Sequence, residues 1–254
     1  QKPSTLAVVT KRKKWRLALG VAASVRKLLT LGVWLFYELR APLITVQTAF
    51  AEQQTLILPD SSVVELNANS SISYRDNWTN KAHRVVWLTG EAFFHVTKKH
   101  QTGQKFCVLT DDLTVEVLGT SFNVNTHHEQ TKVFLEEGKV NLNFDTFSED
   151  MLMEPGELVT YSQKTKKALI LTPKSEEPSS WRDGFVFLEN AEFSDILQKI
   201  NEIYGLTYKV VDQAHLTRKF TLAIPIDNYD TMLSALQEIT GLTVKRTDTQ
   251  LVIE

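Results

Sequence analysis

The sequence is poor in cysteine, because Cys107 is the only one among 254 residues. A single cysteine excludes an internal disulfide, and it also excludes a cluster of metal-binding thiolates within one chain. Cys107 lies in the apolar run Phe106–Leu109. This context predicts a small buried core residue rather than a reactive thiol.

The sequence also lacks the motifs of common enzyme classes. It contains no dinucleotide-binding glycine fingerprint, P-loop, zinc-protease HExxH motif or nucleophile elbow. The one histidine cluster, His127-His128, suits a metal poorly, since neighbours on a strand point to opposite faces, and we expect it in a solvated loop. Asp111-Asp112 lies between two predicted strands and indicates a hairpin turn. We therefore expect no enzyme, no cofactor and no metal site.

Acidic residues are almost absent from the first 40 positions, which hold nine Lys or Arg and only Glu38 as an acid. The remaining residues hold 28 − 9 = 19 bases and 30 − 1 = 29 acids, a net charge of −10. An acidic body argues against nucleic acid as a partner. A basic end is typical of a tail on the cytoplasmic side of a membrane, with the rest exported.

Residues 17–37 are long enough to span a membrane as one helix, after a basic tail at 1–16. Trp15, Trp34 and Tyr37 suit the two interfaces, but Arg26 and Lys27 near the middle make insertion marginal. A cleaved signal peptide and an amphipathic surface helix remain alternatives. The spanning helix predicts a single-pass inner-membrane protein with a cytoplasmic N-terminus and a periplasmic body.

Residues 45–172 show short runs rich in Val, Phe, Thr and Leu, separated by turn residues. This pattern is typical of a mainly β domain, with a sandwich or jelly-roll-like double sheet. Glu91 is the only charge in its apolar stretch, and we expect it to bond backbone amides at a corner. The predicted strands are 55–58, 63–66, 85–88, 92–97, 105–109, 114–118, 121–125, 132–135, 139–144 and 158–161.

Several motifs in this region resemble the FecR family of sigma-factor regulators, in the family's order. They are Leu58–Ser62, Leu66–Ser70, Arg84–Val96, Val117–Val124, Glu136–Val140 and Pro155–Glu157. The family usually has glycine where Ser61 stands, so the turn type here is expected to differ. These motifs predict turns and corners of the fold rather than catalytic residues.

The polar segment 173–182 is typical of an interdomain linker. After it, residues 185–211 and 221–246 repeat each other at an offset of 36, so that Glu202–Lys209 aligns with Glu238–Lys245. Each copy predicts a strand, an amphipathic helix (192–204 and 229–240) and a second strand, with 250–253 as a last strand. Residues 183–254 therefore predict a small α+β domain of two βαβ repeats.

This repeat is similar to the secretin and TonB short N-terminal domain, in the variant at the C-terminus of FecR-like proteins of Bacteroidetes. Together the resemblances imply an anti-sigma factor that relays the state of a TonB-dependent outer-membrane transporter to an extracytoplasmic-function sigma factor. The partner-binding candidates are the second helix and the last strand, through Asp230, Gln237, Leu251 and Ile253.

The family usually carries a helical sigma-binding domain of several tens of residues before the membrane helix. Only about fifteen residues precede the predicted span here. The chain is then either a fragment or a reduced member, and its sigma contact is implied by the resemblance alone. The alternative is a periplasmic ligand-binding or envelope-assembly module, for example a glycan sensor, without a sigma partner.

Overall fold

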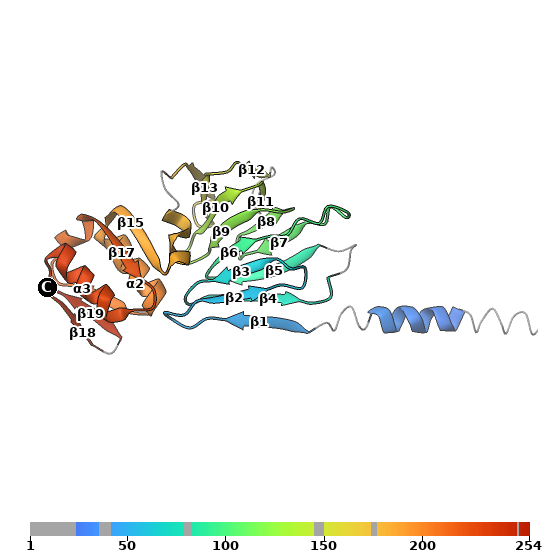
Figure 1. Cartoon of the computed structure of the whole chain (residues 1–254), viewed down its shortest axis with the longest axis horizontal. Helices are drawn as coiled ribbons and strands as arrows, with labels where there is room; N and C mark the ends of the chain where they lie inside the picture. Colours follow the sequence, from blue (N-terminus) through green and yellow to red (C-terminus); the bar gives the residue numbers. More distant parts are fainter. Residues whose placement is uncertain (1–23, 36–41, 79–82, 145–149, 174–176, 248) are drawn as a thin grey trace, which may run out of the picture. The chain divides into compact units, whose positions relative to one another are not determined.

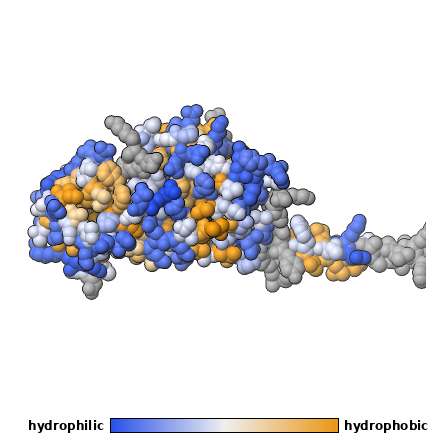
Figure 2. Space-filling view, in the orientation of Figure 1, coloured by the Kyte–Doolittle hydropathy of each residue, from blue (hydrophilic) through white to orange (hydrophobic). Residues whose placement is uncertain are grey.

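A computed structural model describes residues 24–35, 42–78, 83–144, 150–173, 177–247 and 249–254. The chain divides into two compact units, residues 1–42 and residues 43–254. In the first unit, residues 24–35 are helical and exposed, and Figure 2 shows both apolar and hydrophilic side chains on this helix. No helix within the described ranges has the length and apolar character needed to cross a bilayer. The predicted span 17–37 lies partly outside these ranges.

The second unit begins with a β domain, the name used here for Leu43–Leu171, whose strands form two seven-stranded sheets (Figure 1). The first sheet has the order β1-β4-β5-β7-β8-β11-β12 and the second β14-β13-β10-β9-β6-β3-β2. Its strands are β1 (Leu43–Gln47), β2 (Gln54–Ile57), β3 (Val63–Leu66), β4 (Ser71–Arg75), β5 (Arg84–Thr89), β6 (Glu91–His95), β7 (Phe106–Leu109), β8 (Leu113–Val117), β9 (Ser121–Asn125), β10 (Thr131–Glu137), β11 (Val140–Phe144), β12 (Met151–Met153), β13 (Leu158–Ser162) and β14 (Lys167–Leu171).

One apolar core joins the two sheets, and it includes Val108 and Val115 from the first sheet and Phe94 and Phe122 from the second. Phe94 and Phe122 stack at a centroid distance of 5.1 Å. This arrangement confirms the predicted double sheet and all ten predicted strands, to within two residues at each end. Strands β1, β4, β12 and β14 were not predicted, and Cys107 is buried as expected.

The family motifs meet inside the β domain. Arg84 is fully buried and pairs with Asp60 of the Leu58–Ser62 turn, and its guanidinium also donates to the Thr97 carbonyl oxygen at 2.8 Å. Ser61 has a φ of 69°, a left-handed conformation that glycine adopts readily. The expected change of turn type is therefore not required, since Ser61 takes a backbone conformation that suits glycine.

The rest of the second unit is a C-terminal domain, the name used here for Phe185–Ile253. It contains β15 (Phe185–Glu192), α2 (Phe193–Tyr204), β16 (Thr207–Val210), the 3-10 helix η2 (Gln213–Thr217), β17 (Lys219–Pro225), α3 (Tyr229–Thr240), β18 (Val244–Arg246) and β19 (Gln250–Ile253). Strands β15 and β17 form one sheet, and β16, β19 and β18 form another. Both predicted helices are present, and so is the predicted strand–helix–strand order of each copy.

Candidate functional site between the β domain and the C-terminal domain

The outer face of the second sheet carries polar side chains, as a sandwich face that meets solvent normally does. Here, however, another part of the chain covers this face. Side chains alternate along a strand, so Glu91 and Phe93 of β6 point away from the core that contains Ala92 and Phe94. Phe93 belongs instead to the apolar cluster of the C-terminal domain, together with Ile196 of α2. The C-terminal domain therefore packs on this outer face.

Glu91 is the buried charge at this contact, with 3% of the residue exposed. Its carboxylate accepts hydrogen bonds from the side-chain amides of Asn67 and Asn123, both at 2.9 Å. It also pairs with the Nζ of Lys199, on α2, at 3.2 Å. The expectation that Glu91 bonds backbone amides at a corner is thus wrong, because its partners are side chains, one of them from the other domain.

Lys199 joins two carboxylates, since its Nζ also lies 2.8 Å from Oε2 of Glu202. Burial by itself would lower the pKa of Lys199, but Glu91 and Glu202 outweigh it and raise that pKa well above its ordinary value. Burial would likewise raise the pKa of Glu202, yet the charge of Lys199 holds it below its ordinary value. The second oxygen of Glu202 contacts Nε2 of His128 at 2.6 Å. A chain of polar contacts thus runs from β6 across α2 to the loop after β9.

A second contact is made by Trp181, which lies in the 3-10 helix η1 (Glu177–Asp183) and is 2% exposed. Its indole N–H donates to Oδ1 of Asn123 at 3.1 Å, and its carbonyl oxygen accepts from Gln53 at 2.9 Å. Next to it, the Arg182 guanidinium lies 3.8 Å from the ring centre of Phe93. The second half of the predicted linker is therefore a docked helix and not a plain connection.

A third contact is made by the loop between β1 and β2. The backbone N–H of Ala51 donates to the carbonyl oxygen of Ile203, in the last turn of α2, at 2.8 Å. The ring of Phe50 lies so close to Gly205 that a Cβ built on this glycine would be 2.7 Å from Cε2 of the ring. The C-terminal end of α2 is thus held directly by the β domain.

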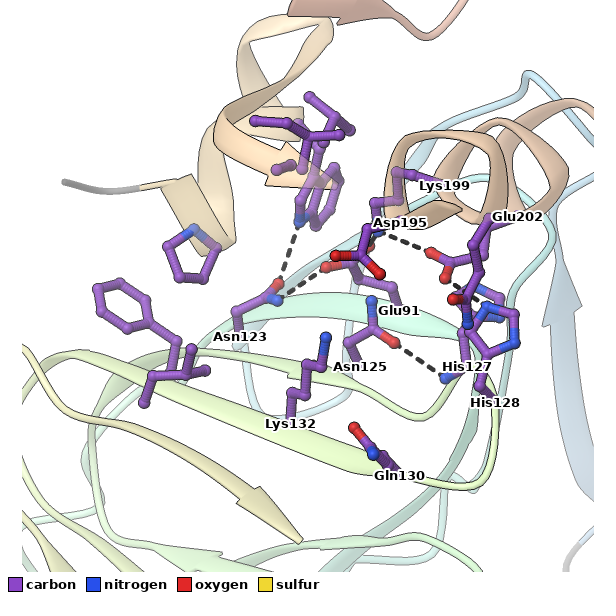
Figure 3. A pocket seen from close by; sticks show the side chains of 18 of the residues that line it. Glu91, Asn123, Asn125, His127, His128, Gln130, Lys132, Asp195, Lys199 and Glu202 are labelled. Atoms are coloured by element: carbon purple, nitrogen blue, oxygen red, sulfur yellow. Dashed lines mark hydrogen bonds and ion pairs between the residues drawn. The ribbon is translucent and has the colours of Figure 1, made fainter. Parts of the chain in front are cut away.

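A cavity of about 840 Å³ opens beside these contacts, with walls from both domains (Figure 3). His127 and His128 line it from the loop after β9, and His128 is exposed while His127 is half-buried, which confirms the expected loop position and the solvent exposure of His128. Burial lowers the pKa of His127 below its ordinary value, although the carboxylates of Glu202 and Glu91 act in the opposite direction. Among the described residues, no group of three or more histidine, cysteine or acidic side chains could hold a metal ion.

The predicted partner-binding residues lie elsewhere, on α3 and β19. Leu251 and Ile253 are fully buried, and β19 is bonded on both sides, by β16 and β18. These two side chains cannot meet a partner, which corrects that part of the prediction. Gln237 donates to the carbonyl oxygen of Val244 at 3.2 Å, and Asp230 is exposed in the first turn of α3.

Sequence reasoning missed the contact residues Glu91, Asn123, Trp181 and Lys199 as a set. One signal was available, because Asp195, Lys199 and Glu202 are spaced i, i+4, i+7 and form a charged stripe along α2. The aligned positions of the second copy are Thr231, Ala235 and Glu238, so only the first copy carries this stripe.

Comparisons with known proteins place the chain among proteins of this architecture. The family model described as FecR protein matches residues 44–141, and the model described as FecR, C-terminal matches residues 185–253. Two crystal structures of proposed anti-sigma factors from Parabacteroides distasonis ATCC 8503 are similar, each with a TM-score of 0.70. They are 25% and 23% identical, and the matches cover 84% and 83% of this chain and 98% of each of theirs.

A search of curated proteins finds no match. The two family models follow one another in the order of the two domains, and together they match more than half of the chain. The chain therefore belongs to the FecR family.

Proposed function

We propose that this protein is an anti-sigma-type signal transducer of the cell envelope. Membership of the FecR family and the similarity to a proposed anti-sigma factor support a regulatory role. In this proposal the chain crosses the inner membrane once, with its body in the periplasm. The C-terminal domain receives the state of a TonB-dependent outer-membrane transporter, and the signal reaches an extracytoplasmic-function sigma factor on the cytoplasmic side.

The observation that carries the proposal is the Glu91–Lys199–Glu202 chain between the two domains. A buried ion pair depends steeply on geometry, since its charges have lost their water and each needs the other in place. A partner that shifts α2 would therefore leave the buried Glu91, on the outer face of the second sheet, without its cation. This arrangement suits transmission of a binding event from the C-terminal domain to the β domain.

The test is a titration of the purified full chain with the N-terminal signalling domain of the transporter encoded beside it. We expect saturable binding with a Kd of about 1 µM or tighter by calorimetry. Hydrogen exchange of the amides of Ser121–Asn125, in β9, should change on binding, because Asn123 of this strand is hydrogen-bonded to both Glu91 and Trp181.

The variant Lys199→Ala separates binding from transmission. It should bind the transporter domain within about threefold of the unsubstituted chain, while the exchange of β9 no longer responds. Lys139→Ala, which changes an exposed lysine of the β domain, is the matched control and should respond normally. Absence of binding at high micromolar concentration by a folded chain would reject the relay.

A ligand-binding or envelope-assembly module without a sigma partner is the second candidate function. The cavity between the domains is the observation that favours it, because its volume of about 840 Å³ falls within the range of small-molecule sites. Deletion of the neighbouring sigma-factor gene distinguishes the two functions. The relay requires that gene for any change in transcription, whereas the binding module does not.

A further inference from the structure

We propose that the cavity between the two domains binds a short peptide with a free ammonium group and a free carboxylate. One wall is the outer face of the second sheet with the loop after β9, and the other is formed by α2 together with η1 and β15. The cavity volume of about 840 Å³ accommodates a few amino-acid residues. This proposal does not rest on the relay to a sigma factor, since it concerns occupancy of the cavity alone.

Opposite charges face the cavity from its opposite walls. Lys132 extends from β10 and Asp195 from α2, and Figure 3 shows both side chains directed into the space. Within the described part of the chain, neither side chain has a hydrogen-bond or ion-pair partner. A ligand with charges of both signs at its two ends satisfies both walls, its carboxylate at Lys132 and its ammonium at Asp195.

The other acidic side chains and lysines of the cavity already have partners within the wall. Lys199 pairs with Glu91 and Glu202, Glu202 also contacts His128, and the exposed Glu129 and Lys164 pair at 3.5 Å. Their mutual contacts hold this part of the wall fixed, so a ligand meets a preformed surface. Among the described lining residues, Lys132 and Asp195 are thus the ammonium and the carboxylate that have no ion-pair partner.

The remaining lining matches a peptide backbone and an apolar side chain. Asn125, Gln130 and Gln198 offer amide groups, each with a donor and an acceptor, as a peptide bond has. Phe134 and Leu158 supply an apolar part of the sheet wall. A tripeptide with a central leucine combines these features. Because it touches both domains, such a ligand stabilises their packed arrangement by mass action.

The experiment is a calorimetric titration of the purified full chain with glycyl-leucyl-glycine, its N-acetylated form and its C-amidated form. We expect a Kd of about 10–1000 µM for the free tripeptide, and about tenfold weaker binding for each blocked form. Maltose serves as a neutral saccharide probe. Asp195→Asn and Lys132→Gln change exposed side chains, so both variants should fold normally.

The variants assign each end of the peptide to one wall. In Asp195→Asn, N-acetylation should no longer weaken binding, while C-amidation still does, and Lys132→Gln should show the reverse. Asp230→Asn, on α3 outside the cavity, should behave as the unsubstituted chain. Lack of saturable binding by the free tripeptide, equal sensitivity to blocking in all variants, or binding of maltose but not of peptide would each overturn the proposal.

Discussion

The two helices of the C-terminal domain occupy equivalent places in an internal repeat but have different surroundings. Helices α2 and α3 both have 12 residues, and each ends at a glycine with a φ of 69°. Their outer faces differ, because Lys199 of α2 aligns with Ala235 of α3. Near the C-terminal end, Ile203 is 1% exposed, whereas the aligned Ile239 is 41% exposed.

The two copies of the repeat therefore share a secondary structure but present different surfaces. The first copy carries a charged stripe and lies against the second sheet, while the second copy has the same secondary structure without that stripe. Besides the backbone contact at Ile203, α2 therefore contributes to the contact between domains through side chains that α3 lacks. Substitutions at aligned positions should consequently have unequal effects.

The largest effect is expected for Lys199→Ala, which gives α2 the residue of α3. Glu91 would remain buried without its cation, and we expect the free energy of unfolding to fall by about 3–5 kcal/mol. Urea denaturation followed by tryptophan fluorescence measures the change. Adding Glu91→Gln to Lys199→Ala should recover part of the loss, because no uncompensated buried charge would remain. If the double variant is less stable than Lys199→Ala, the ion pair does not account for the loss.

A smaller effect separates Ile203→Ala from Ile239→Ala. Ile203 is enclosed by the apolar cluster, so its truncation should cost about 2–4 kcal/mol of unfolding free energy. Ile239→Ala removes an exposed side chain and should cost about 0.5 kcal/mol. The same denaturation measurement applies to both variants. Equal losses would mean that α3 is covered as fully as α2.

The two cap glycines provide a still finer comparison. Alanine at either position must adopt a left-handed backbone, which costs about 1–2 kcal/mol. Gly205→Ala should cost about 1 kcal/mol more than Gly241→Ala, since its Cβ meets the ring of Phe50, while nothing lies within 4 Å of a Cβ at Gly241. Thermal unfolding of the two variants checks the difference. Replacing Phe50 with alanine should abolish it.

Much of the fold could be predicted from the sequence, because local patterns determine it. The stripe spacing and the cap glycines placed α2 and α3, and alternation placed strands such as Leu113–Val117. The edge strands β1, β12 and β14 escaped prediction, since their residues are largely exposed. Strand β4 escaped as well, because its serines and tyrosine lie among turn-like residues.

The candidate site was harder to predict, since it joins residues far apart in the chain. Glu91 and Lys199 are 108 positions apart, and nothing near Glu91 in the sequence indicates a cation above it. The exposure of Ile239 could not be foreseen either, because the apolar cluster that encloses Ile203 includes Ala68 and Phe93, which are far away in the sequence. Leu251 and Ile253 were chosen as accessible residues, but β19 became a central strand once β16 and β18 paired with it.

The smallest expected effect is a pH dependence of the unfolding free energy that arises at the contact between α2 and the second sheet. His127 lies near Glu202, Glu91, Lys199 and His128, and burial lowers its pKa below the ordinary value of 6.5. The unfolded chain therefore binds a proton at His127 more tightly than the folded chain does. The stability that depends on a neutral His127 is complete above pH 6.5, and it is lost as the pH falls from there through the pKa of the folded state. The lowered pKa of Glu202 adds its own loss only below its ordinary value of 4.5, and the raised pKa of Lys199 acts only above 10.5.

Between pH 7 and 5, the unfolding free energy should therefore decrease by at most about 1.4 kcal/mol per pH unit through His127. Urea denaturation at a series of pH values measures this slope. His127→Gln should flatten it, whereas His83→Gln, which changes an exposed histidine of the β domain, should leave it unchanged. If His127→Gln keeps the full slope, the protons are taken up elsewhere. The contact between α2 and the second sheet would then be insensitive to pH in this range.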